Sequence, residues 1–211
     1  MQADYPSQGA DIIIRKARHS DLDALVGVLA EAYDKDLLMN WIVFQDEKRI
    51  QRMKKYFEVS LKDYSMKYDH VFATEELSGV AIWYPPEPRN CWKASTLKHL
   101  SLTHTWISIA GIRKYLTLFI ADEIVKKHHF KEPHYYLSVI GVHPEHQGKG
   151  VASHLIRHVL HMCNERSVPA FLETATERNL GYYGQLNFKV IEEYVLPQNG
   201  PKVWTMIYEP K

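Results

Sequence analysis

Cysteine is scarce in this sequence, which has only Cys91 and Cys163 among its 211 residues. Two cysteines this far apart form neither a disulfide framework nor a metal-binding spacing, and they are typical of a chain kept in a reducing compartment. The first residues, MQADYPSQGADII, lack the basic and apolar regions of a secretory signal. These observations together predict a cytoplasmic protein.

An excess of charge of one sign is missing as well. The chain has 26 basic and 25 acidic residues, a formal net charge of +1 and no dense basic block. A nucleic acid or an anionic membrane is therefore not expected as a partner. The most apolar helical stretch, residues 106–121, is interrupted by Arg113 and Lys114 and is too short to span a bilayer.

The apolar content of 45% and the charged content of 24% are those of an ordinary globular protein. No internal repeat or low-complexity tract is present, and the length favours one domain over residues 1–211. A helical segment at about residues 91–130 is interpreted as an excursion between strands. We prefer this to a separate helical domain because the 80 residues after it cannot close a sheet alone.

The hydrophobic pattern predicts strands and helices over most of the chain. Strands are expected at residues 11–16, 70–74, 79–84, 134–142, 170–174, 188–196 and 203–208. Helices are expected after a cap at residues 19–21, at about 46–61, in two pieces broken near Gly111, at 150–166 and at 178–186. This order predicts an α/β (α+β) fold, a mixed sheet with helices on both faces.

A glycine-rich turn, VHPEHQGKGVAS (residues 142–153), separates the fourth expected strand from a helix. Bare backbone at a helix start lets N–H groups approach an anion. A P-loop needs a hydroxyl residue after its lysine, but Gly150 follows Lys149. A dinucleotide fingerprint needs a glycine where Ser153 stands and an acid about 20 residues on, near which only Glu165 of the same helix lies. Both patterns fail on spacing.

The turn fits a third phosphate-binding pattern, Q-x-x-G-x-[GA], through Gln147, Gly150 and Ala152. In such a turn, consecutive backbone N–H groups and the helix dipole hold a pyrophosphate without a metal. A plain glycine turn that caps a helix remains the alternative.

A second block, FLETATERNLGYYGQLNF (residues 171–188), follows downstream. With the glycine turn, it resembles the GNAT superfamily of N-acetyltransferases, which bind acetyl-coenzyme A at such a turn. The block is similar to the family pattern L-E-x-x-x-x-x-N-x-x-x-Y-x-x-x-G-F at Leu172, Glu173, Asn179, Tyr183 and Phe188. Asn187 replaces the usual glycine, and asparagine tolerates a positive φ. KEPHYYLSVIGVHPEHQGKG and LPQNGPKVWTM are also similar to the puromycin N-acetyltransferase group.

The resemblance, which spans residues 131–209, implies a GNAT-type, mostly antiparallel central sheet with a splayed parallel strand pair. It implies direct acetyl transfer from acetyl-coenzyme A, as cosubstrate and with no metal, to a primary amine of a small molecule. A monomer or homodimer is expected. The rival hypotheses are an acyl-coenzyme A binding sensor without turnover and an interaction module with no cofactor affinity.

The resemblance also implies roles for individual residues. Tyr183 is the expected general acid and Glu173 the leading candidate for the base, acting through water; packing and a surface carboxylate are the respective alternatives. The Val142 N–H is expected to polarise the thioester carbonyl, and Glu31, Tyr33 and Asp34 are alternative bases. The expected acetyl-coenzyme A contacts are Ile140, Gly141, Val142, Gln147, Gly148, Lys149, Gly150, Val151, Ala152, Ser153, Asn179 and Tyr183.

The histidines suggest a metal site at first sight, because His154, His158 and His161 follow helical spacing. They fall on the polar face without a carboxylate or cysteine ligand, so no metal is expected. The pair His128-His129 is expected to be a solvated helix end, and His143 to lie near the substrate. Residues 33–44, 91–129 and 198–202 are expected to border the acceptor.

Overall fold

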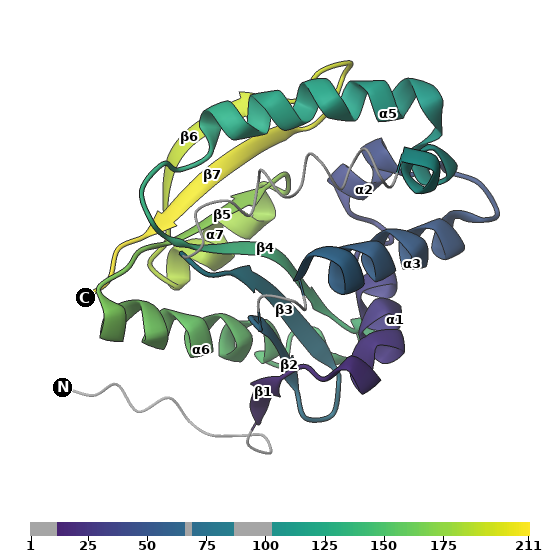
Figure 1. The fold of residues 1–211 in the computed structure, drawn as a ribbon. Helices are drawn as coiled ribbons and strands as arrows, with labels where there is room; N and C mark the ends of the chain where they lie inside the picture. The colour runs from purple at the N-terminus through teal and green to yellow at the C-terminus, as the bar shows by residue number, and fades with distance from the viewer. Residues whose placement is uncertain (1–11, 66–68, 87–102) are drawn as a thin grey trace.

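The computed structural model of the protein describes residues 12–65, 69–86 and 103–211 (Figure 1). Within these residues the chain forms a seven-stranded sheet in the order β1-β2-β3-β4-β5-β7-β6. Its strands are β1 (Ile14–Lys16), β2 (Val71–Thr74), β3 (Gly79–Tyr84), β4 (Tyr135–Val142), β5 (Ala170–Thr174), β6 (Lys189–Val195) and β7 (Lys202–Tyr208). The helices are α1 (Leu22–Ala32), α2 (Leu37–Ile42), α3 (Arg49–Val59), α5 (Thr103–His128), α6 (Val151–Arg166) and α7 (Arg178–Gln185).

The sheet is antiparallel apart from one parallel pair, β4 with β5. Parallel neighbours need a crossover connection, and α6 supplies it. The expected fold class, a mixed and mostly antiparallel sheet with one parallel pair, is confirmed.

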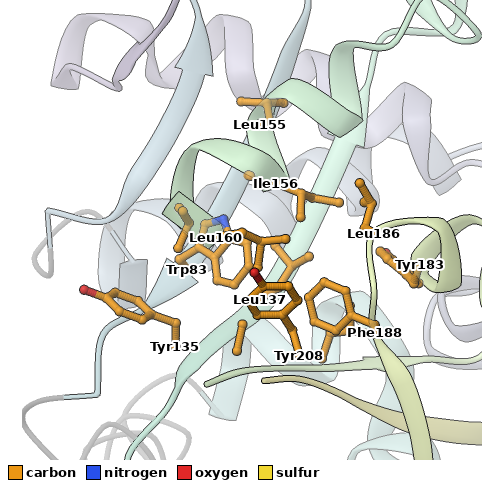
Figure 2. Packing of buried hydrophobic residues seen from close by; sticks show 14 of the residues in the cluster. Trp83, Tyr135, Leu137, Leu155, Ile156, Leu160, Tyr183, Leu186, Phe188 and Tyr208 are labelled. Atoms are coloured by element: carbon orange, nitrogen blue, oxygen red, sulfur yellow. The ribbon is translucent and has the colours of Figure 1, made fainter. Parts of the chain in front are cut away.

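Helices cover both faces of the sheet because apolar residues alternate sides along its strands. On β3, Ala81 and Trp83 pack in the core under α6 with Leu155, whereas Val80 and Ile82 pack under α1 and α3. Figure 2 shows the α6 side of the core, where Tyr183 of α7, followed by Leu186 and Phe188 between α7 and β6, contributes side chains beside Leu137 and Tyr208.

α5 lies along the β6–β7 hairpin (Figure 1). The Thr117 hydroxyl donates to Gln198 Oε1 in the β6–β7 turn at 2.7 Å, and the Lys114 ammonium lies 4.2 Å from the centre of the Trp41 ring in α2. Side chains of α2, α5 and the hairpin form a shared apolar cluster. The three segments expected to border the acceptor therefore meet, as far as they are described; Cys91 and Trp92 lie outside the described residues.

Two elements differ from the predictions. Residues 37–42 form α2, which the hydrophobic pattern did not predict; the Asp36 carboxylate caps it by accepting the Met39 N–H at 3.0 Å. The helix expected at about 46–61 runs from Arg49 to Val59 and continues as a π-helical turn over Ser60–Ser65. A six-residue helix is too short for its periodicity to be recognised, whereas a cap fixes it locally.

The expected break near Gly111 is confirmed. Gly111 has φ 79° and ψ 159° and interrupts α5. A Cβ at this position would also lie 2.4 Å from the Phe44 ring. Only glycine adopts this backbone region readily, so the residue itself creates the kink.

We predict opposite effects of two glycine-to-alanine changes. Gly111→Ala should lower the free energy of unfolding by about 1–3 kcal/mol, because alanine is strained at this φ and ψ. Gly27→Ala should raise it by up to about 1 kcal/mol, because Gly27 lies inside α1, where an added Cβ would meet nothing within 4 Å. Urea unfolding of both variants tests this, and changes of the same sign would contradict it.

Candidate active site

The site is built where β4 and β5 part. Their pairing covers Tyr135 to Leu137 on β4 against Ala170 to Leu172 on β5. Beyond these residues β4 continues to pair with β3, and β5 with β7. Ser138 forms a β-bulge on β4, because its neighbours Leu137 and Val139 pair with two successive residues of β3. We call the region beyond Leu137 and Leu172 the fork.

Alternate backbone groups of β4 point into the fork. The Ile140 N–H donates to the Tyr33 hydroxyl at 3.3 Å, so it faces away from β3. Successive backbone N–H groups of a strand point to opposite sides, so the N–H of Val142, two residues on, points the same way as that of Ile140. The N–H of the next residue, His143, points the other way and donates to Ser78 O. The Val142 N–H therefore faces the fork. Ile140 was expected to contact acetyl-coenzyme A, but its N–H already has the Tyr33 hydroxyl as its partner.

Gln147 and Gly141, two of the residues expected to contact acetyl-coenzyme A, have local structural roles. The Gln147 side chain donates to Val142 O at 3.0 Å and ties the glycine turn to the end of β4. A Cβ on Gly141 would lie 2.7 Å from the Leu29 side chain, so this glycine lets α1 approach the sheet. Neither role was found from the sequence, because both depend on partners brought close only by folding.

The glycine turn has the backbone that an anion site needs. Gly148 and Gly150 have φ values of +76° and +81°, and a Cβ on Gly148 would meet nothing within 4 Å. Gly150 precedes α6, whose first turn, Val151 to Ser153, contains no acidic side chain. The first N–H groups of a helix have no partner within it, and they attract negative charge. Lys149 is exposed beside them.

Tyr183 comes from α7, which follows β5 along the chain. Its side chain is 6% exposed and packs beside Leu186 and Phe188 (Figure 2). Within the described part of the chain no group hydrogen-bonds its hydroxyl. Burial, followed by the nearby Tyr182 and Asp36, raises the pKa of Tyr183 well above its ordinary value. The phenol is therefore protonated at neutral pH and able to donate.

Tyr183 also influences Tyr33, whose hydroxyl accepts the Ile140 N–H at the fork. A charge on Tyr183 contributes to raising the pKa of Tyr33, after the larger effect of burial. Tyr182, the neighbour of Tyr183, instead bonds the Ser153 hydroxyl at 3.2 Å. The two neighbouring tyrosines therefore differ in their surroundings: Tyr182 contacts Ser153 in the first turn of α6, and Tyr183 packs in the core.

The remaining residues of the second block hold α7 in place. Asn179 Nδ2 lies 3.5 Å from Thr174 Oγ1 at the end of β5, and the Asn179 N–H donates to Thr176 O at 2.9 Å. Asn179, which was expected to contact acetyl-coenzyme A, thus has bonds within the chain at the start of α7. Asn187 has φ +66°, the left-handed conformation for which asparagine is a suitable replacement for glycine.

Glu173 stands one residue beyond the last pair of β5 with β4. Its side chain is 12% exposed, and it accepts hydrogen bonds from Tyr136 at 3.0 Å and Tyr194 at 3.3 Å. Burial raises the pKa of Glu173 to about 7, and the two tyrosine hydroxyls partly oppose that rise. Glu173 is thus a buried carboxyl that titrates near neutral pH, which suits a proton acceptor.

The expectation of a solvated histidine pair at the end of α5 is wrong for His129, which is only 9% exposed. Its ring lies against Tyr136 and Phe171, with ring centres 4.9 and 4.8 Å away. Burial, with the charges of His134 and Lys131, lowers the pKa of His129 to about 3. The end of α5 packs on the sheet, and this long-range contact is invisible in the local pattern.

The alternative bases lie in different surroundings. Glu31 Oε2 is 3.0 Å from His143 Nε2, and both side chains are partly exposed. Asp34 pairs with Arg49 at 3.3 Å. Of the three alternatives, Tyr33 alone bonds a backbone group that faces the fork.

The histidines of α6 have separate partners. His154 Nδ1 lies 2.9 Å from Gly150 O, the His158 ring packs on Phe72 and His161 pairs with Glu165. Across the described residues, no three His, Cys, Asp or Glu side chains gather as metal ligands. None of the helices described is long and apolar enough to cross a membrane.

We predict that Glu173→Gln makes stability less dependent on pH. Because the pKa of Glu173 is raised, its carboxyl group stabilises the fold fully at pH values below the ordinary pKa of 4.5. This stabilisation is lost as the pH rises through about 7, where the buried carboxyl becomes charged. The loss amounts to up to about 3 kcal/mol. The variant should therefore gain stability relative to wild type between about pH 5 and about pH 8.

Urea unfolding at both pH values measures this difference. Glu193→Gln is the control, because Glu193 is exposed on β6 and pairs with Lys202. If Glu173→Gln and the control change stability equally at both pH values, the carboxyl of Glu173 does not titrate near neutrality.

Comparisons with known proteins agree with the observed fold. A protein from Corynebacterium glutamicum, described as histone acetyltransferase HPA2 and related acetyltransferase, aligns with a TM-score of 0.72 at 21% identity, over 95% of this chain and 97% of that one. An N-acetyltransferase from Staphylococcus aureus gives 0.60 at 18% identity, over 93% and 100%. The polyamine N-acetyltransferase of Drosophila melanogaster gives 0.61 at 12%, over 94% and 100%. At these identities the likeness shows the fold alone.

The family relationship comes from the sequence itself. The model of the acetyltransferase (GNAT) family matches residues 51–188, from α3 to the residue before β6. This match covers well over half of the chain and includes the glycine turn, Glu173 and Tyr183. The chain belongs to the acetyltransferase (GNAT) family.

Proposed function

We propose that this protein is an N-acetyltransferase that moves an acetyl group directly from acetyl-coenzyme A to a primary amine of a small molecule. The observation that carries the proposal is the fork. Glu173, with a pKa of about 7, lies at the point where β4 and β5 part, and the helix that follows β5 carries Tyr183, whose phenol is protonated. Family members generally use acetyl-coenzyme A as the donor.

The glycine turn suits the pyrophosphate of this donor. Gly148 to Ser153 present backbone N–H groups at the start of α6, and the surroundings of Gly148 are open. We propose that Lys149 also contacts the pyrophosphate, because its exposed ammonium adds a positive charge. The rest of the donor would follow β4 past Ile140, Gly141 and Val142 toward the fork.

In the proposed reaction, the amine must lose a proton before it attacks the thioester. The Glu173 carboxylate takes this proton, directly or through water, while the hydroxyls of Tyr136 and Tyr194 hold the carboxylate in position. The attack forms the C–N bond and places negative charge on the carbonyl oxygen. We assign the stabilisation of that charge to the Val142 N–H, which faces the fork.

The transfer ends when the C–S bond breaks and the sulfur leaves as a thiolate. The Tyr183 phenol donates a proton to this sulfur. Glu173 faces α5 on one side of the sheet, and Tyr183 packs in the core on the α6 side. We infer that the base serves the acceptor and the acid serves the donor from different sides of the fork.

We place the acceptor among α2, α5 and the β6–β7 turn. These segments share an apolar cluster near Glu173, which supports an acceptor with an apolar part and one amine. The subgroup that we propose on the sequence resemblance is that of puromycin N-acetyltransferase. The Drosophila neighbour is described as forming N-acetylagmatine, so the same fold accommodates a small amine there.

We predict release of free thiol from acetyl-coenzyme A when a panel of small primary amines is supplied. Gly150→Asn should weaken acetyl-coenzyme A binding at least about tenfold, since asparagine accepts the left-handed backbone but places a side chain before the helix start. Calorimetry measures the binding, and circular dichroism checks the fold. Tight binding without thiol release from any amine would favour a sensor instead.

We predict that Tyr183→Phe lowers kcat by roughly 10²-fold at saturating acceptor, the low end for a positioned general acid. KM for acetyl-coenzyme A should change little, because the phenol acts as charge develops on sulfur. The assay is run above the apparent pKa of the amine, so that deprotonation of the amine does not limit the rate.

The matched control for this change is Tyr208→Phe. Tyr208 is buried in the same core (Figure 2), and its hydroxyl donates to Asn164 Oδ1 at 2.9 Å. This variant should lose stability but keep turnover. If Tyr183→Phe stays within about threefold of wild type, the phenol is not the acid and its role is packing.

A further inference from the structure

Two histidines form a chain of contacts that ends at Glu173. His134 Nδ1 lies 2.6 Å from the backbone oxygen of Glu132, and His134 Nε2 lies 3.2 Å from His129 Nε2. The other nitrogen of His129, Nδ1, lies 4.0 Å from Glu173 Oε1. The chain runs from a surface loop before β4, across the end of α5, to the fork.

The positions of the protons along this chain follow from the first contact. A carbonyl oxygen can only accept, so His134 Nδ1 carries the hydrogen. Burial lowers the pKa of both histidines, which are therefore neutral, and a neutral imidazole carries one hydrogen. His134 Nε2 is then an acceptor, and the hydrogen in the second contact belongs to His129 Nε2. His129 Nδ1 is left with a lone pair that faces Glu173.

We propose that His134 and His129 are positioning residues that fix this tautomer and so favour the protonated form of Glu173. A lone pair opposite a carboxylate repels it, whereas a protonated carboxyl can donate to the same lone pair directly or through one water. The opposite tautomer would donate to the carboxylate and favour its charged form. The backbone oxygen of Glu132 thus determines, through two rings, how strongly Glu173 holds a proton.

The device suits a base that must hold the proton it removes. This inference rests on the proposed function, in which Glu173 takes a proton from the amine. Once protonated, Glu173 has His129 Nδ1 as an acceptor on one side. The hydroxyls of Tyr136 and Tyr194 donate to the carboxyl oxygens in either state. The two histidines therefore influence whether Glu173 is protonated, and the two tyrosines hold its carboxyl group in position.

Other ionisable groups near Glu173 are few among the described residues. β4 contributes Tyr136, β6 contributes Tyr194, and the end of α5 contributes His129. Lys131 acts on His129, and His128 pairs with Glu192 at 2.8 Å while its ring stacks on Tyr194. Of these groups, only His129 depends on His134 for its tautomer.

The experiment follows the titration of Glu173 in the full-length protein without substrate. Carbon-13 NMR of labelled glutamate side chains gives the midpoint, and Glu173→Gln identifies the signal. His134→Phe keeps an aromatic ring against Phe171 but removes the nitrogen that orients His129. His129 can then donate to the carboxylate, and the midpoint should fall by about one unit.

Phe130→Leu is the matched control. Phe130 packs on the rings of His134 and Phe171, but it carries no proton. In Phe130→Leu, the titration midpoint of Glu173 should stay at the wild-type value. Equal midpoints in wild type and His134→Phe, or equal shifts in His134→Phe and Phe130→Leu, would overturn the proposal. So would nitrogen-15 NMR that finds the hydrogen of wild-type His129 on Nδ1.

A kinetic measurement connects this device to turnover. With an amine found active in the panel, the acidic limb of the pH profile of kcat/KM should move down by about one unit in His134→Phe. An unmoved limb, with the NMR midpoint shifted, would overturn the role of the histidines in the reaction. If no amine is acetylated, the proposed function fails, and the NMR titration still decides whether the tautomer is fixed.

Discussion

The parting of β4 from β5 after Leu137 and Leu172 is the constraint on which the rest of the site depends. A parallel pair normally satisfies the inner backbone groups of both strands. Here the pairing stops, so the N–H groups of Ile140 and Val142 face a region that no strand fills. Such groups need partners: the Tyr33 hydroxyl accepts the Ile140 N–H, whereas the Val142 N–H faces the fork.

The crossover between these two strands places the other parts of the site. α6 must begin where β4 ends, which puts the glycine turn beside the open end of the fork. β5 must then return parallel to β4, which puts Glu173 at the point of parting and α7, with Tyr183, just after it. One topological feature thus brings together a glycine turn at a helix start, a carboxyl and a phenol that are separated along the chain.

Burial then adjusts the chemistry of these groups. The same packing that encloses the fork raises the pKa of Glu173 to about 7 and lowers that of His129 to about 3. An enclosed carboxyl destabilises the fold once it is charged, so the site is a compromise between reactivity and stability. α5 is part of this compromise, because its end brings His129 onto the sheet beside Phe171.

The sequence by itself determined the elements and motifs that depend on neighbours along the chain. The turn at Gly148 and Gly150, α6, the hairpin of β2 with β3 and the break at Gly111 all follow from local periodicity or from backbone freedom. Only the tertiary structure decided which groups share a site. Gly141 is needed because Leu29 packs on it, and His129 is buried because α5 returns to the sheet. The pKa of Glu173 depends on burial and on Tyr136 and Tyr194, which lie far from it along the chain, so no local pattern contains that information.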